Sequence, residues 1–237
     1  MNIKKIIAII ASTALTATLL ASCGSSSSGK AAKKVTKDGK ELSVLRVANM
    51  TGQPDQYADY IGMEQGIFEK YGISLETSEY AAGINTVDAI VTGSAIKKYE
   101  AEGWTQVASA KDIGINVSAY LITSSDFAKN NTETLTNYLK ALDESVKYIN
   151  DNLDESAEKI SKKYGIEPDD FKTNWEQYSI KLGLSEEAAS HLDEINKWAY
   201  DNGKYPNSYN IREFYYPDSA KKAFPDNVTA DLTKTDK

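Results

Sequence analysis

The sequence predicts an α/β protein: a single lobe with a parallel-rich sheet and flanking helices, followed by a helical C-terminal half. Two segments rich in β-branched residues, 42–48 and 73–80, are typical of strands and flank a stretch with helical spacing. Parallel strands need a crossover of about this length, which is usually a helix. Beyond Asn131 the apolar residues recur at helical spacing alone, which predicts helices without further strands.

The amino-terminal segment combines a basic start, a short apolar run and small residues before a cysteine. Lys4 and Lys5 precede an apolar run over residues 6–20, and a serine-rich stretch follows Cys23. This order is typical of a secretory signal peptide over residues 1–22. The run is short for a membrane-spanning helix. We therefore expect the mature protein to begin at Cys23 and to work outside the cytoplasmic membrane.

The sequence Leu20-Ala21-Ser22-Cys23 resembles the lipobox of bacterial lipoproteins. In that family the cysteine thiol receives a diacylglyceryl group and the peptide is cut before it. The resemblance implies that Cys23 anchors the protein to the outer face of the cell membrane. The alternative is an ordinary signal peptide with an incidental cysteine. Because Cys23 is the only cysteine, disulfides within the chain and a thiol catalyst elsewhere are excluded.

The rest of the composition predicts one soluble domain on a tether. Residues 23–41 are rich in Ser, Gly, Lys and Ala without an apolar period, so we expect a flexible tether there. Residues 42–225 suit one α/β domain, and residues 226–237 are expected to form a disordered tail. Removal of residues 1–22 changes the net charge from −7 to −9. An acidic chain argues against nucleic acid or anionic lipid as partners.

The elements of the first half follow from apolar spacing and from turn residues. Residues 51–55 interrupt the first strand. Ile73, Leu75 and Thr77 alternate with polar residues, as in a strand with one covered face. In order, we expect a helix from Tyr57 to Gly72, a strand over 73–80, a helix from about Asn85 to Glu102, and short strands over 107–110 and 117–123.

Four helices are expected after Asn131, from apolar stripes at a spacing of three or four residues. Asn130 and Glu133 approximate a capping box at the start of the first helix. Trp175 and Trp198 fall on such stripes, so we expect both in the core. The remaining boundaries are a stop at Gly165, a start at Pro168, a start at Ser185 and a stop near Gly203.

Little in the sequence indicates catalysis or metal binding. His191 is the single histidine, so no metal site of nitrogen and sulfur ligands can be assembled. No serine has a base nearby in sequence. The acidic pairs at residues 169–170 and 186–187 fall in first turns of helices, where they favour the helix dipole, although such pairs also suit Ca²⁺. We therefore expect neither an enzyme nor a cofactor nor a metal site.

Three segments in order carry a resemblance to a known family. They are residues 61–76 (IGMEQGIFEKYGISLE), residues 80–94 (YAAGINTVDAIVTGS) and residues 120–131 with the helix after them. This order resembles solute-binding proteins of ABC importers, of the nitrate, sulfonate and taurine type. The resemblance covers nearly all of the mature chain. It implies a periplasmic-binding-protein-like (type II) fold, in which two α/β lobes clamp a ligand.

The chain departs from that family near residues 95–96. After Ser94 the family finishes one lobe, crosses over, builds the second lobe and returns, whereas here Ala95 runs directly into a segment that resembles the part after the return crossover. The missing part is ~100 residues, about the size of a small domain. We therefore expect an internal deletion that leaves one lobe. The alternatives place the missing part on another chain, or restore it by exchange between two self-associated copies.

Two turns of the retained lobe are expected to contact a ligand, because ligands of open α/β sheets lie beyond the carboxyl ends of strands, where helices begin. We expect the contact through backbone N–H groups there. Asn85 and Thr86 suit a helix cap equally well, and with Arg46 and Arg212 as the only arginines no bidentate anion clamp is evident. The candidate ligand-binding residues are Thr51, Gly52, Gln53 and Asp55 in the first turn and Ala82, Gly83, Asn85 and Thr86 in the second.

The resemblance implies a solute-binding component of an ABC importer. Its partners would be a permease and an ATPase, and its ligand a small anion such as a sulfonate, taurine or nitrate, or a heterocycle such as a thiamine precursor. Loss of a lobe predicts weak or absent binding, because less of the ligand can be buried. A tethered relic or interaction module without ligand is the alternative. The same fold includes pyrimidine-precursor synthases, but export and the lack of a cysteine-histidine cluster speak against an enzyme.

Overall fold

A computed structural model describes residues 31–80, 103, 105, 107 and 119–234. Several expectations lie outside the described residues: the signal peptide, Cys23, the helix from about Asn85 to Glu102 with its join near 95–96, and the second turn with Ala82, Gly83, Asn85 and Thr86.

The described sheet has three strands in the order β1-β2-β3, namely β1 (Lys34–Lys37), β2 (Lys40–Met50) and β3 (Ile73–Tyr80). β2 and β3 are parallel, with Leu45 opposite Leu75, whereas β1 is antiparallel to β2. The α/β class and the parallel pairing of the two predicted strands are therefore confirmed. The sheet itself is small and mixed.

The prediction of a flexible tether up to residue 41 is wrong for its last part. Residues 34–37 and 40–43 pair as a hairpin, and residues 38–39 turn between them. The turn residues Asp38 and Gly39 have φ angles of 49° and 75°, the left-handed conformation that an Asp-Gly hairpin turn requires. The Asp-Gly pair was overlooked in the sequence because the surrounding residues are rich in lysine and lack an apolar period.

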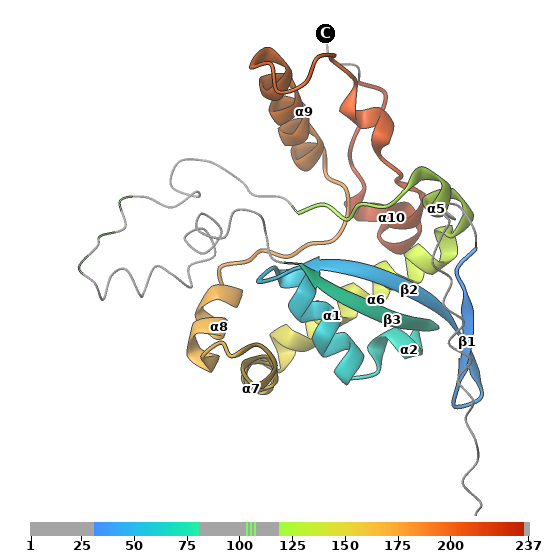
Figure 1. Ribbon diagram of the computed structural model, residues 1–237, viewed down its shortest axis with the longest axis vertical. Coiled ribbons are helices and arrows are strands. Elements are labelled where there is room, and N and C mark those ends of the chain that lie inside the picture. The colour runs from blue at the N-terminus through green and yellow to red at the C-terminus, as the bar shows by residue number, and fades with distance from the viewer. Residues whose placement is uncertain (1–30, 81–102, 104, 106, 108–118, 235–237) are drawn as a thin grey trace, which may run out of the picture.

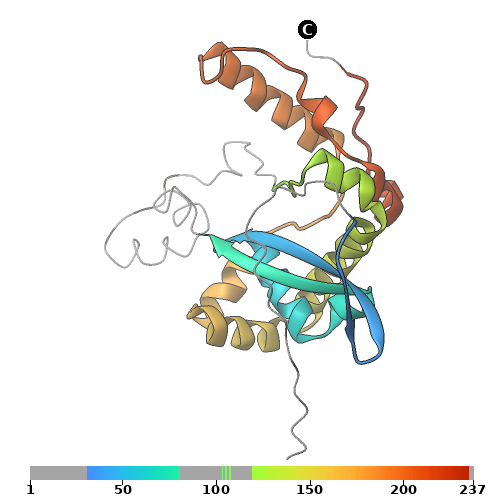
Figure 2. The same cartoon turned by 45° about the vertical axis from the view of Figure 1, so that its right-hand side comes forward.

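Helices cover one face of the sheet, as both views show (Figure 1, Figure 2). They are α1 (Pro54–Glu64), α2 (Ile67–Lys70) and the long α6 (Thr132–Asp151). The single helix expected from Tyr57 to Gly72 is in fact two, because Gly66 between them has a φ of 66°. Beside them lie α7 (Leu153–Tyr164) and α8 (Pro168–Trp175), with Gly165 and Pro168 at the predicted boundaries.

One hydrophobic core joins the sheet to α1, α2, α6, α7 and α8. Phe68, Ile61 and Ile73 are its largest fully buried residues from the first half of the chain, and Ile149 and Ile160 come from the second half. Trp175 also lies in this core, as predicted. The core thus connects strands and helices that are about 100 residues apart in sequence, which the views show side by side (Figure 1).

The C-terminal part follows this body and contains α9 (Glu186–Asp201), η1 (Ile211–Phe214), α10 (Asp218–Ala223) and η2 (Pro225–Asn227). Here α9 projects from the body, whereas α10 lies against it, with Ser219 Oγ donating to Thr132 O of α6 (Figure 1). We call residues 185–216 the arm. Ser185 caps α9 as predicted, since its side chain accepts a hydrogen bond from Ala188 N. Of the described residues, none in the arm belongs to the hydrophobic core cluster.

Two further predictions about the C-terminal part are wrong. Trp198 is 58% exposed, because the stripe of α9 faces away from the core. The tail is ordered at least to Lys234, since Thr229 N and Ala230 N donate to Leu184 O and Asp231 N donates to Glu186 Oε2. The polar composition suggested disorder, but backbone pairing fixes this segment.

Two local predictions before α6 also need correction. Asn131, not Asn130, is the N-cap of α6, and it makes no side-chain cap bond. Its side chain instead accepts from Ala32 N and donates to Phe127 O, which joins α6 to α5 (Ser125–Asn130) and to the chain before β1. Residues 119–123, part of a predicted strand, have no regular secondary structure. No helix in the described part of the chain is both long and apolar enough to span a bilayer.

Candidate functional site

The first predicted turn lies at the carboxyl ends of both parallel strands. Thr51 follows β2 and binds the end of β3, since its N and Oγ1 both donate to Tyr80 O, at 3.0 and 3.2 Å. Gly52 has a φ of 88°, which favours glycine. Gln53 is the N-cap residue of α1, and Pro54 occupies its first turn. The turn therefore has the position at which open α/β sheets bind ligands.

The backbone donors of this turn are already used within the chain. Gly52 N donates to Gln56 Oε1 at 2.8 Å, Gln53 N to Met50 O at 3.3 Å, and Gln56 N to Gln53 O at 3.1 Å. Burial raises the pKa of Asp55, and backbone N–H groups of Asp55 and Gln56 donate to its carboxylate, which opposes the rise. The start of α1 thus already holds a carboxylate. A ligand that bound these backbone N–H groups, as the sequence predicts, would have to displace the hydrogen bonds that they already make within the chain.

A cavity of about 240 Å³ adjoins the turn. Five of its wall residues are aromatic and the others are small, polar or aliphatic. It is lined by Thr51, Gly52, Gln56, Tyr57, Tyr164, Ile166, Phe171, Asn174, Trp175 and Tyr178.

The aromatic wall is a connected set of rings from α1, the end of α7, and α8 with the residues after it. Tyr57 meets Tyr164 and Phe171 edge to face, with ring centroids 5.7 and 5.3 Å apart. Phe171 stacks on Trp175 at 5.6 Å, and Trp175 meets Tyr178 edge to face at 6.3 Å. Such contacts fix ring orientations and are worth ~1 kcal/mol each beyond burial. The wall is therefore preformed.

Two of these rings are held further by hydrogen bonds. Trp175 Nε1 donates to Asn150 Oδ1 at 2.7 Å, so the indole cannot rotate without losing a buried bond. Burial and the neighbouring Glu79 carboxylate, to which its hydroxyl is hydrogen-bonded, raise the pKa of Tyr164. Burial likewise raises the pKa of Tyr57 to about 12, so its hydroxyl stays protonated at neutral pH.

Gln56 is the most deeply buried of the polar amide and hydroxyl residues Thr51, Gln56 and Asn174 in the wall. It is 1% exposed, and its Oε1 is used by Gly52 N. Its Nε2 is buried and has no hydrogen-bond partner among the described residues. An unpaired buried donor costs free energy, and because this atom has almost no accessible surface a solute would reach it only if the Gln56 side chain moved. Sequence reasoning missed Gln56, because a single glutamine in a helix carries no signal, and it assigned Trp175 to the core alone.

A buried polar cluster lies beneath the turn. Asn49 Nδ2 donates to Asp59 Oδ2 at 3.0 Å, and the Tyr138 hydroxyl donates to Asp59 Oδ1 at 3.2 Å. Burial raises the pKa of Asp59 to about 7, with the Asp55 charge adding to the rise and the bonds from Asn49 and Tyr138 opposing it. This cluster connects β2, α1 and α6. It lines no cavity and supports the turn from below.

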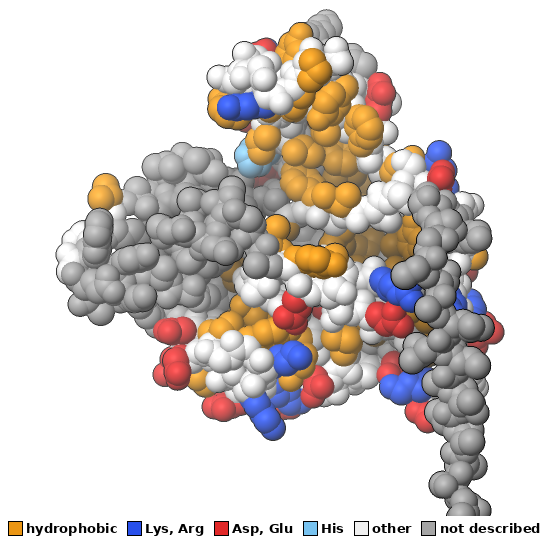
Figure 3. Space-filling model, viewed as in Figure 1, with side chains coloured by type: hydrophobic (Ala, Val, Ile, Leu, Met, Phe, Trp, Pro, Cys, Tyr) orange, Lys and Arg blue, Asp and Glu red, His pale blue; other side chains and the backbone are white. Residues whose placement is uncertain are grey.

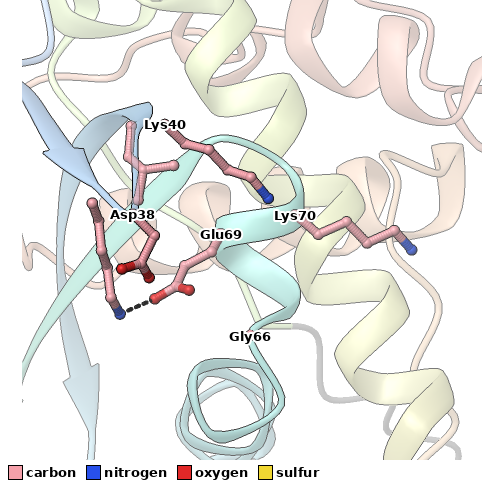
Figure 4. A pocket seen from close by; sticks show the side chains of 7 residues that line it. Asp38, Lys40, Gly66, Glu69 and Lys70 are labelled. Atoms are coloured by element: carbon pink, nitrogen blue, oxygen red, sulfur yellow. Dashed lines mark hydrogen bonds and ion pairs between the residues drawn. The ribbon is translucent and has the colours of Figure 1, made fainter.

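A second pocket, of about 170 Å³, lies at the opposite end of β2, between the β1–β2 hairpin and α2. Lys37 is ion-paired with Glu69 across it, and Lys70 extends away from it (Figure 4) toward Glu144. Most of its charges are thus paired with each other or with neighbours. We interpret this pocket as the seam that fastens the hairpin to α2.

The structure brings some predicted site residues together and not others. Thr51 and Gly52 line the aromatic cavity, whereas Gln53 and Asp55 lie in the same turn without lining it. The second predicted turn is outside the described residues. Within the part that the structure describes, no cluster of three or more potential metal ligands is present. No family model, curated protein or solved structure matches this chain.

Proposed function

We propose that this protein is a membrane-anchored, extracytoplasmic solute-binding component of an ABC importer. In this proposal Cys23 carries the lipid anchor, the cavity beside Thr51 and Gly52 holds the solute, and a permease and an ATPase take the solute onward. The lipobox-like sequence and the resemblance of three segments to solute-binding proteins support the importer role.

The observation that carries the proposal is the position of the aromatic cavity. It opens at the turn between β2 and α1, beyond the carboxyl end of a strand, where physical reasoning places ligands in open sheets. A site with a rigid aromatic wall and a few polar groups is typical of small-molecule binding. A single lobe buries less of a solute than a closed two-lobe cleft, so we expect weak binding.

A solute screen with a plugged cavity tests the proposal. Asn174 is half-buried in the cavity wall, whereas Gln177 is exposed and lies outside the wall on the residues that follow α8. We expect solutes to shift the melting temperature of the wild type and of Gln177→Phe, but not of Asn174→Phe. Equal solute binding by both variants would place the site elsewhere. Absence of binding by the wild type across anionic, neutral and cationic solutes would overturn the proposal.

One observation favours the second candidate, a tethered interaction module without a solute. The arm exposes six large apolar side chains: Ile195, Trp198, Tyr200, Tyr209, Phe214 and Tyr216. Figure 3 shows hydrophobic side chains gathered on the upper part of the molecule. Contiguous exposed apolar residues mark interaction sites more often than chance. If this candidate holds, Trp198→Ser with Phe214→Ser will change the sedimentation of the protein, and no solute will stabilise it.

A further inference from the structure

The charge of the aromatic cavity is informative about its solute. None of the residues that line it is Lys, Arg, Asp or Glu. The ion that lies nearest to the start of α1 is Asp55, whose carboxylate already accepts the backbone N–H groups of that first turn. A small anion would therefore meet no cationic side chain among the lining residues and would compete with a carboxylate for the helix start.

The same rings suit a cation. Aromatic faces attract ammonium groups within about 6 Å of the ring centroid, and several rings around one site add their contributions. The molecule itself gives an example of this attraction, since Lys163 Nζ lies 6.0 Å from the centroid of Tyr164, although Lys163 is not among the residues that line the cavity. Trp175, the strongest cation-binding ring type, is the central ring of the wall.

We propose that the cavity binds a small organic cation, an alkylated ammonium compound with a nearby hydroxyl or carbonyl oxygen. The rings of Tyr57, Trp175 and Tyr178 line the space for the ammonium group, and the uncharged polar side chains of Thr51 and Asn174 in the same wall suit the oxygen. This inference rests on the proposed solute-binding function and names its substrate class. It differs from the anions that the family resemblance implies.

The size of the cavity is consistent with such a solute. At ~30 Å³ per water molecule, the volume of about 240 Å³ corresponds to roughly eight waters. An alkylated ammonium compound the size of choline has a similar number of non-hydrogen atoms. A larger aromatic cofactor would exceed this space.

Three solutes that differ only in the head group give a direct test. Choline, 3,3-dimethylbutanol and isethionate share a hydroxyethyl group and carry a positive, a neutral and a negative head. Calorimetry on the full-length chain in non-ionic detergent should show choline binding about tenfold more tightly than the neutral isostere, from the cation–π contribution. Isethionate should not bind. Equal affinity for choline and dimethylbutanol, or no choline binding, would overturn the inference.

Variants at Tyr178 test the role of the ring face. Tyr178 is half-buried, so Leu and Phe substitutions keep most of its packing. Tyr178→Leu should bind choline at least ~fivefold more weakly than Tyr178→Phe, because only phenylalanine retains a ring face. Gln177→Ala, outside the wall, should bind as the wild type does. Equal choline affinities of the Leu and Phe variants would contradict the aromatic site.

The outcomes separate this inference from the function on which it rests. Binding of isethionate, nitrate or a neutral pyrimidine in place of choline, abolished by Asn174→Phe, would overturn the cation class and support a solute-binding protein. Binding of none of these solutes would overturn both.

Discussion

Asp59 is the residue whose charge state the fold controls most directly. It has no exposed surface, and among the described residues its carboxylate accepts hydrogen bonds from Asn49 and Tyr138. Desolvation raises its pKa from 3.8 to about 7. The folded protein therefore binds a proton at Asp59 between about pH 4 and pH 7, whereas the unfolded chain does not. Between these pH values the contribution of Asp59 to the free energy of unfolding therefore falls as pH rises. Above about pH 7 the folded protein bears the whole cost of burying the charged carboxylate.

Asp59→Asn is predicted to stabilise the protein at pH 8. A full shift of this size corresponds to ~4 kcal/mol, and relaxation around the carboxylate lowers the gain to ~2 kcal/mol. The amide keeps an acceptor for Tyr138, and after a flip of the Asn49 amide it donates to Asn49 Oδ1 in place of the present bond from Asn49 Nδ2. Urea unfolding of the variant and the wild type at pH 8 and pH 4.5 measures this change in the free energy of unfolding. The gain should shrink at the lower pH, and a loss of stability at both would show that the carboxylate is needed.

Gly62 lies on α1 at a point where α6 packs so closely that there is no room for a side chain. A Cβ atom at this position would meet Ser145 Oγ and the ring of Phe68. We predict that Gly62→Ala destabilises the fold by ~2 kcal/mol, because overpacking a tight helix contact forces the helices apart. Ser145→Ala should recover part of this loss in the double variant, measured by thermal unfolding. Additive losses in the double variant would mean that the contact with Phe68 alone decides the cost.

At the scale of elements, the arm is fastened by one buried guanidinium. Arg212 is 2% exposed, and its three nitrogens bind Asp193, Glu186 and the carbonyl oxygen of Asp231. The hydrogen bond from Arg212 and, as the next largest cause, the one from Lys234 hold the pKa of the Glu186 carboxyl well below its usual range. η1, α9 and the C-terminal tail thus meet at this side chain. The planar fork of arginine is needed for such a set of bonds.

Arg212→Lys is predicted to loosen the tail and leave the body folded. The amides of Thr229, Ala230 and Asp231 should exchange with solvent at least ~tenfold faster, since loss of charge-assisted bonds costs ~1.5 kcal/mol or more. Hydrogen exchange read by mass spectrometry measures this. The matched control is Arg46→Lys, which alters one exposed pair with Glu76 and should change little. Equal effects of the two substitutions would contradict the role of Arg212.

Elements with strong local signals could be predicted from the sequence, and those decided by context could not. The start of α8 at Pro168 and the cap of α9 at Ser185 follow from local chemistry. The break at Gly66 does not, because a glycine within an apolar period is compatible with a continuous helix until packing decides. Trp198 lies on an amphipathic stripe, but periodicity cannot say whether anything covers the stripe.

At the scale of the whole molecule, the two candidate functions belong to different parts. The cavity is built by the body, from the turn after β2 and the α7–α8 region, whereas the exposed apolar residues concentrate in the arm. The arm contributes nothing to the hydrophobic core among the described residues. A substitution in one part should therefore leave the other intact, since distant sites with no shared partners act independently. Solute binding and self-association can be tested separately.

This separation also explains how much of the candidate site was accessible from sequence. Thr51 and Gly52 were predicted because ligands of open α/β sheets bind beyond the carboxyl ends of strands. The aromatic wall was not, since Tyr57 and Phe171 meet only through tertiary packing across more than 100 residues of chain, and Trp175 joins the wall by stacking on Phe171. Aromatic residues on a helical stripe look the same in sequence whether they fill a core or line a cavity.

Membrane attachment through Cys23 is the prediction that concerns the protein as a whole. The basic start, the apolar run and Leu20-Ala21-Ser22-Cys23 resemble a lipidation signal ahead of an acidic chain. Anionic lipid would repel a net charge of this sign, and we propose a covalent lipid on Cys23 as the means of attachment. The wild type should therefore fractionate with membranes and incorporate a labelled fatty acid. Cys23→Ala should abolish the label and release the protein, whereas Ser27→Ala, outside the motif, should behave as the wild type. Fatty-acid labelling that persists in Cys23→Ala would refute the anchor, and with it the placement of the cavity at the membrane surface.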